Sequence, residues 1–415
     1  MSTTTESPSG HARVTSIDAL RGFVMFTMIF VNDIAGVSPK IVPAWMRHFK
    51  GRSGMTFVDM VFPAFLFIVG MSIPFALGGR LRAGVPWWKT IVHVAGRSVA
   101  LLAIGILMVN DESPGPDMTG LPPALWAVLM YLSAMLAFCS ISPTLARESS
   151  RAWITRSLRV LGLCGMVALA FMFRGDKGQR IISLSPFVIH TEWYGILGLI
   201  GWAYLVGSGV YLTFRVNALP LLCCVVLLLG LYPADRAGLL DHVWLGRYVG
   251  IGETLGAQPS ITVAGLLLVS ILLQGEKENR SRTVRFTLLF VLGFAAAAVL
   301  LNGLYGINKN EATPSWCLWA CAFTAALWLI FHLVCDGAST PRFGKLLAVA
   351  GQNVLLAYLI SEMLPSLLEL IHLDTAYDAL AGGSLATAIA RSAGCGVVIL
   401  CVTAGLNRAG FRLKL

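Results

Sequence analysis

Charged residues are scarce in this chain. Asp, Glu, Lys and Arg make up 13% of its 415 residues, whereas 56% are hydrophobic. Soluble domains carry about 25% charged residues, so this composition excludes a soluble domain and predicts a polytopic membrane protein. The formal net charge of +10 does not indicate nucleic-acid binding, because no segment of domain size is polar enough to present a basic face to water.

The signature motifs of soluble enzymes are missing as well. The chain has no P-loop, no Gly-x-Ser-x-Gly elbow and no Rossmann fingerprint, and Gly250, Gly252 and Gly256 have the wrong spacing for a nucleotide-binding loop. The nine cysteines form no metal-binding pattern, and Cys317 and Cys321, one helical turn apart, are better explained as small buried hydrophobic residues. We therefore expect no bound metal.

Apolar runs bounded by glycine, proline and charged residues predict an all-α bundle of 10–12 transmembrane helices, at about 20 residues per span. The runs lie near 17–37, 58–78, 90–109, 122–142, 154–173, 194–214, 217–233, 259–274, 285–303, 315–335, 345–366 and 386–407. The seventh and eighth runs are short enough to be tilted or re-entrant. No internal repeat is obvious.

The charges of the loops predict which side of the membrane each loop faces. Lys and Arg concentrate in cytoplasmic loops, and a cytoplasmic N-terminus places most of the basic loop residues on that side. These are Arg80, Arg82, Lys89, Arg147, Arg151, Arg156, Lys277, Arg280, Arg282, Arg285, Arg342 and Lys345. Both termini are then cytoplasmic, with residues 1–12 as a disordered tail and residues 13–415 as one transmembrane domain.

The segment from Asn32 to Pro74 carries the strongest sign of chemistry. His48 lies on a polar loop between the first two predicted spans, on the extracytoplasmic side. Asp59, where the chain re-enters the membrane, could orient the imidazole or raise its basicity. An ordinary solvated loop histidine is an equally weighted alternative. His190, beside Glu192, is the chief rival for a catalytic histidine.

The first predicted helix has polar residues at both ends of one face. Asp18, Arg21, Met25, Met28 and Asn32 recur at helical spacing, which places Arg21 and Asn32 about 16 Å apart along the axis. Two explanations stay open. The face could connect a cytoplasmic cation to an extracytoplasmic amide, or Asp18 and Arg21 could form a simple i, i+3 ion pair while Asn32 caps the far end.

Four segments resemble the heparan-α-glucosaminide N-acetyltransferase family. They are SIDALRGFVMFTMIFVND (16–33), His48 with GMTFVDMVFPAFLFIVGMSIPFAL (54–77), INKNEATPS (307–315) and GQNVLLAYLISEML (351–364). A fifth, WYGILGLIGWAYL (193–205), is similar to the bacterial branch found with N-acetylglucosamine-use genes. The resemblance spans residues 13–365. The usual Trp-(Asn/His)-Gly after the histidine is replaced here by Arg52-Ser53-Gly54.

The resemblance implies transfer of an acetyl group from cytosolic acetyl-CoA to a glucosamine end across the membrane. Coenzyme A is a polyanion that cannot enter hydrocarbon, so its nucleotide stays at the basic face. We expect Arg21, Arg80 and Arg97, with Asp18 beside Arg21, to hold it; for Arg80 the general positive-inside bias is the alternative.

On the other side, the resemblance implies that His48 and Asn32 stand at the family's functional histidine and asparagine. His48 would deprotonate the acceptor or carry the acetyl group briefly, and Asn32 would orient the thioester carbonyl, with Asp59 behind His48. The residues that we expect to contact the acceptor are Asp33, Asn308, Lys309, Glu362, His190 and Glu192. Ordinary loop solvation is an equal alternative for Asn308 and Lys309, and a hydrogen bond between helices is an equal alternative for Glu362.

The predicted function is thus a transmembrane acetyltransferase of a bacterial inner membrane. It would act on a small amino sugar or a glycan, in contact with membrane lipid and without nucleic acid; relatives of this kind are dimers, so a homodimer is an open possibility. A permease for N-acetylglucosamine or its oligosaccharides is the alternative, although neither repeated halves nor paired broken helices are clear. An acyltransferase with a longer acyl donor is a weaker third.

Overall fold

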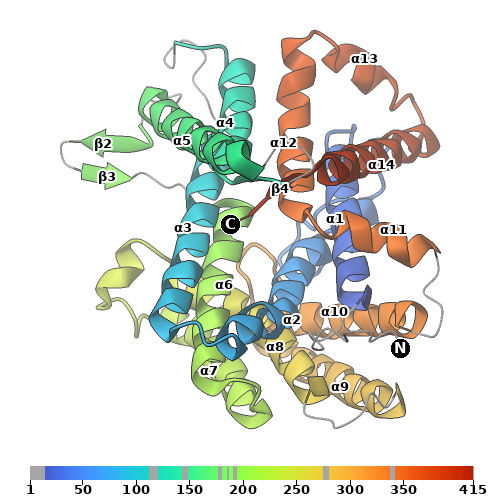
Figure 1. Ribbon diagram of the computed structural model, residues 1–415. Coiled ribbons are helices and arrows are strands. Elements are labelled where there is room, and N and C mark those ends of the chain that lie inside the picture. Colours follow the sequence, from blue (N-terminus) through green and yellow to red (C-terminus); the bar gives the residue numbers. More distant parts are fainter. Residues whose placement is uncertain are drawn as a thin grey trace, which may run out of the picture.

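The computed structural model describes residues 15–111, 120–142, 148–175, 180–184, 187–189, 194–273, 280–336 and 342–414. These residues form a helical bundle with two small two-stranded sheets (Figure 1), which confirms an all-α polytopic membrane protein. The α-helices are α1 (Thr15–Ala35), α2 (Val61–Arg82), α3 (Trp87–Asp111), α4 (Pro123–Ala137), α5 (Glu148–Met172), α6 (Gly195–Phe214), α7 (Ala218–Arg236), α8 (Gln258–Leu273), α9 (Arg280–Tyr305), α10 (Pro314–Cys335), α11 (Arg342–Ala350), α12 (Val354–Leu370), α13 (Asp374–Ala379) and α14 (Leu385–Ala409).

Short elements connect the helices. They are the 3-10 helices η1 (Ala44–Met46), η2 (Val58–Met60) and η3 (Trp244–Arg247), the π-helix η4 (Ile251–Ala257), and the strands β1 (Cys139–Ile141), β2 (Ile182–Leu184), β3 (Phe187–Ile189) and β4 (Phe411–Leu413). Strand β1 pairs antiparallel with β4, and β2 with β3.

Every predicted span coincides with helical structure. Within the described residues, nine helices are long and apolar enough to cross a membrane, or ten when the bent pair α11 and α12 is counted as one span. The other two predicted spans are α4, which at 15 residues is shorter than the roughly 20 that a bilayer core requires, and α1, which carries charged side chains near both ends. The eighth span is not short, because η4 extends α8 into a 23-residue helix.

The span predicted at 345–366 is not continuous. Helices α11 and α12 meet at 74° around Gly351. A Cβ added to Gly351 would overlap the carbonyl oxygen of Asp18, and one added to Gly22 would overlap that of Leu347. The bend therefore lies where the backbones of α1 and α11 touch, a contact between glycines far apart in sequence.

Helices α2 and α8 form the centre of the bundle. In their apolar windows 72% and 83% of the residues are buried, against 22% in α5, α7 and α9. A Cβ on Gly70 of α2 would overlap the carbonyl oxygen of Thr262, and one on Gly265 of α8 that of Phe67. Such close backbone approach allows the Thr262 hydroxyl to donate a hydrogen bond of 3.0 Å to the Leu66 carbonyl across the interface.

Contacts between segments at the ends of the helices agree with the predicted alternation of loops between the two sides of the membrane. The β1–β4 pairing joins the segment after α4 to the C-terminal strand, and the Ser16 N–H at the start of α1 donates to Asp336 at the end of α10 (2.9 Å). At the opposite end, the Gly54 N–H donates to the Ile307 carbonyl (2.8 Å). Segments predicted on one side thus contact each other, while which side is cytoplasmic stays a prediction.

We expect Gly70→Ala to lower the free energy of unfolding by about 1 to 3 kcal/mol, because the methyl group overpacks the α2–α8 interface. The thermal unfolding midpoint in detergent measures the effect. Gly79→Ala is the matched control on α2, since a Cβ there meets nothing within 4 Å. Equal midpoints for the two variants would contradict close packing at Gly70.

Candidate active site

His48 is held by a buried carboxylate. Its Nδ1 lies 2.8 Å from one oxygen of Asp59, whose side chain is 2% exposed. The other carboxylate oxygen accepts the backbone N–H groups of Phe49 (3.1 Å) and Thr56 (3.0 Å). The turn η2 sets Asp59 at the N-terminus of α2, where the helix dipole favours negative charge.

This contact decides the tautomer of His48. A carboxylate accepts and does not donate, so Nδ1 must carry the proton that binds Asp59. Nε2 then has its lone pair available to take a proton from another group. Because the His48 side chain is 49% exposed, an incoming molecule can reach the ring. The arrangement is that of a general base with its orienting group.

Lys309 completes what we term the His48 cluster, namely His48, Asp59 and Lys309. Its Nζ lies 3.2 Å from His48 Nδ1 and 3.9 Å from the same oxygen of Asp59. Burial lowers the pKa of Lys309, and the negative charge of Asp59 acts in the opposite direction. Since Nδ1 already gives its proton to Asp59, the carboxylate is the favourable partner of the ammonium group.

The loop that carries Lys309 is anchored by residues that the sequence reasoning missed. Glu311 accepts from the Asn308 amide (3.3 Å) and, through its other oxygen, from Arg236 at the end of α7 (3.0 Å). The Tyr232 hydroxyl lies 3.4 Å from that second oxygen, and Arg236 also binds Glu253 in η4 (3.1 Å). Glu311 lies in the INKNEATPS segment, and the resemblance of that segment to the family could have identified it. The Asn308 side chain thus makes its contacts within its own loop.

Two hydrogen bonds join this loop to the loop that carries His48. The Ser53 hydroxyl accepts the Ile307 N–H at 3.0 Å, beside the bond from Gly54 to the Ile307 carbonyl. Ser53 and Gly54 belong to the Arg52-Ser53-Gly54 segment in which this chain departs from the family pattern. The departure therefore lies in the contact that brings Lys309 to His48.

Asn32 and Glu362 form a separate pair. The Asn32 amide donates to Glu362 at 2.8 Å, joining the end of α1 to α12. Both residues line two cavities, one of about 520 Å³ toward α13 and α14 and one of about 400 Å³ toward α3, α4 and α6. The Asn32 amide has a second N–H that Glu362 does not take. The structure thus brings two of the predicted site residues together.

Asp33 has its carboxylate oxygens engaged within the protein. One accepts from the Tyr377 hydroxyl (2.6 Å), and the other binds the Ser392 hydroxyl (2.5 Å) and Arg391 (3.1 Å). Burial and the hydrogen bond to Asp33 raise the pKa of the Tyr377 hydroxyl. These contacts tie α1 to α13 and α14, and they favour a structural role for Asp33 over contact with an acceptor.

The predicted cytoplasmic residues fall into two groups. Arg21 binds Asp18 (3.0 Å), the Ser72 hydroxyl of α2 (2.7 Å) and the Gly351 carbonyl (3.3 Å). The predicted i, i+3 ion pair between Asp18 and Arg21 is therefore present, and Arg21 has two further partners outside α1. Its side chain is 22% exposed. Arg21 therefore supports the contact between α1, α2 and the α11–α12 bend.

Arg80 on α2 and Arg97 on α3 both lie close enough to His93 to act on it electrostatically. The Arg97 guanidinium stacks on the Tyr204 ring of α6 at 4.7 Å. The Nε atoms of both arginines are buried and make no hydrogen bond with the described residues. Donors in this state suit an anionic ligand such as a phosphate. His190 and Glu192 lie outside the described residues, as does the predicted tail.

We expect Asp33→Asn to lower the free energy of unfolding by about 3 kcal/mol or more, because it removes the buried partner of Arg391. The Arg391 side chain is 4% exposed. Asp378→Asn is the control, since Asp378 binds the same guanidinium (3.3 Å) but is 78% exposed. Unfolding midpoints that fall equally in both variants would contradict the structural role of Asp33.

Comparisons with known proteins bear on this site. The family described as "Domain of unknown function (DUF5009)" matches residues 13–228. A stretch of 100 residues is 35% identical to human heparan-alpha-glucosaminide N-acetyltransferase and 33% identical to the mouse protein of that name. Each match covers 24% of this chain and 14% of the relative. The resemblance predicted from the motifs is confirmed over that stretch.

Proposed function

The chain belongs to the family described as Domain of unknown function (DUF5009), and we propose that it is a transmembrane acetyltransferase of a bacterial inner membrane. It would move the acetyl group of cytoplasmic acetyl-CoA to the amine of an amino sugar or glycan on the other side. The named relatives are N-acetyltransferases. The observation that carries the proposal is the contact of His48 with buried Asp59, which leaves Nε2 as a base.

The reaction needs one proton transfer and one acyl transfer. As the amine nitrogen attacks the thioester carbonyl, His48 Nε2 takes the amine proton, the C–S bond breaks and the coenzyme leaves as a thiolate. The thiolate then takes the proton from the His48 imidazolium, which restores the neutral base. Asp59 stabilises the imidazolium formed in this step. If His48 instead accepts the acetyl group first, the same nitrogen is the nucleophile. Both routes require the tautomer that Asp59 holds.

Asn32 and Lys309 have supporting roles in the proposal. The Asn32 N–H that Glu362 does not take would bind the oxygen of the acetyl carbonyl, where negative charge develops. The ammonium of Lys309 would keep Asp59 ionised and could also meet the hydroxyl groups of a sugar. Glu362 would help to hold the acceptor, because it lines both cavities beside Asn32.

The coenzyme would lie at the face where Arg80 and Arg97 meet. Their buried Nε atoms fit phosphate oxygens, whereas Arg21 is committed to Asp18, Ser72 and the α11–α12 bend. We assign the nucleotide phosphates to Arg80 and Arg97 and give Arg21 the task of supporting the helices between the two faces.

We expect labelled acetyl-CoA, supplied to the cytoplasmic side of sealed vesicles, to acetylate glucosamine on the other side. His48→Ala and Asp59→Asn should each lower kcat about 100-fold or more, because general base catalysis is lost. His242→Ala, at an exposed loop histidine, is the control and should keep wild-type activity. Transfer that survives His48→Ala would disprove the site, and passage of intact sugar without transfer would favour a permease.

We also expect Arg97→Gln to raise the KM for acetyl-CoA about tenfold with little change in kcat, since a charged phosphate contact is lost. Lys89→Gln is the control, because Lys89 is exposed near the same end of α3 and lies over the Trp88 ring. Initial rates at varied acetyl-CoA measure both constants. A KM that rises equally in the two variants would indicate a general charge effect in place of a phosphate site.

A further inference from the structure

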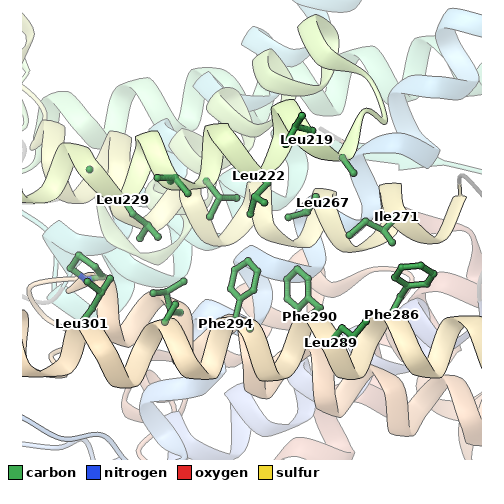
Figure 2. A pocket seen from close by; sticks show the side chains of 18 of the residues that line it. Leu219, Leu222, Leu229, Leu267, Ile271, Phe286, Leu289, Phe290, Phe294 and Leu301 are labelled. Atoms are coloured by element: carbon green, nitrogen blue, oxygen red, sulfur yellow. The ribbon is translucent and has the colours of Figure 1, made fainter.

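An apolar groove of about 820 Å³ lies between α7 and α9 (Figure 2). Side chains of both helices face one another across it, including Leu222 and Leu229 from α7 and Phe290 and Phe294 from α9, while Leu267 and Ile271 of α8 form its floor. Of the floor residues, Leu267 is buried and Ile271 partly buried, whereas rim residues such as Leu219 and Leu289 are exposed. The groove therefore opens sideways, toward the membrane.

The groove runs along the membrane-spanning stretch of the helices. On α7 it reaches from Ala218 to Pro233, and on α9 from Phe286 to Leu301 and Tyr305. At 1.5 Å per residue, fifteen residues correspond to about 22 Å, most of the roughly 30 Å hydrocarbon core. An elongated apolar molecule would thus lie parallel to the helices.

One end of the groove lies at the loop that carries Lys309. Tyr305 and Pro314 both line the groove, and they flank the loop that carries Lys309. Tyr305 packs edge to face on Tyr232 (5.8 Å), whose hydroxyl contacts Glu311 of the same loop (3.4 Å). Aromatic residues of this kind mark the interface between membrane and water. An amphiphile seated in the groove would hold its polar head at the loop that carries Lys309, one member of the His48 cluster.

The apolar lining and the position of the groove favour a hydrocarbon chain over a helix from a second copy. The groove is apolar along its length and ends at Tyr305 and Pro314, beside the loop that carries Lys309, so a chain lying in it can join a polar head group at that end. Lipid tails are as apolar as Leu, so the groove by itself selects little among lipids. Selection must come from the head group, and the groove sets where that head group lies.

We propose that the α7–α9 groove binds the hydrocarbon chain of a lipid-linked amino sugar and presents its head group to the His48 cluster. The inference rests on the proposed acetyl transfer and names the class of acceptor, a glycolipid. It also explains why the groove ends at the two residues that flank the Lys309 loop.

Two glycines allow the groove to be filled without disturbing the protein. Gly230 on α7 and Gly293 on α9 both line it, and a Cβ at either position meets nothing within 4 Å. A leucine there would project into the groove and raise helix propensity. Gly303→Leu, on α9 outside the groove lining, is the matched control, since its Cβ also meets nothing.

The experiment uses the full chain in phosphatidylcholine nanodiscs with hexadecyl glucosaminide bearing a diazirine in its chain. Photolysis should label groove residues such as Leu222 and Leu289, and labelling should fall about tenfold or more in Gly293→Leu but not in Gly303→Leu. In parallel, the KM for hexadecyl glucosaminide relative to methyl glucosaminide should rise about tenfold in Gly293→Leu and stay at the wild-type ratio in Gly303→Leu.

The outcomes separate this inference from the proposed function. Labelling outside the groove, equal labelling by a diazirine phosphatidylcholine, or an unchanged KM ratio in Gly293→Leu overturns the glycolipid groove and leaves acetyl transfer standing. Disulfide-linked dimers of a Leu289→Cys variant overturn it in favour of a second copy. Selective groove labelling without transfer to either glucosaminide supports the groove and overturns the acetyltransferase.

Discussion

The close packing of α2 on α8 is the contact on which the rest of the structure depends. Three residues named in the site lie in or next to α2: Asp59 in η2 just before its first turn, Ser72 near its middle and Arg80 in its last turn. Asp59 and Arg80 are roughly 30 Å apart at helical rise, the thickness of a bilayer core. Gly70 and Gly265 allow α2 to pack closely on α8 at the centre of the bundle, where neighbouring segments lie near Asp59, Ser72 and Arg80.

Polar side chains in this bundle are held in groups with internal partners. A charge buried in hydrocarbon without a partner is costly, and three carboxylates among the described residues are paired: Asp59 with His48, Asp33 with Arg391, and Asp18 with Arg21. The exposed ring of His48 beside fully buried Asp59 differs from the other pairs, because it keeps one reactive atom in reach of an incoming molecule. That difference is the reason for proposing a catalytic role for His48 and Asp59 and a structural role for the other pairs.

The His48 cluster and the α7–α9 groove share their supports. Glu311 and Tyr232 anchor the Lys309 loop, and Tyr232 packs on Tyr305 at the groove's end. Occupation of the groove would therefore bear on the same loop that places Lys309 beside His48. The α7–α9 groove and the loop that carries Lys309 are therefore structurally coupled.

The amino-acid sequence by itself determined the class of protein, the positions of twelve helices and the identity of His48 and Asp59 as a candidate pair. It could do so because hydropathy and charge are local properties, and because these two residues are only 11 apart in the chain. Lys309 was expected near the acceptor but not against His48, from which it is separated by 261 residues.

Contacts between distant segments were decided by the tertiary structure. The bend at Gly351 depends on the backbone of α1, the structural role of Asp33 on Arg391, and the groove on the spacing of α7 and α9 over α8. Each of these features results from packing between helices. The hydrophobic periodicity of one helix does not indicate which helix it packs against, because an apolar surface fits lipid and a neighbouring helix equally well.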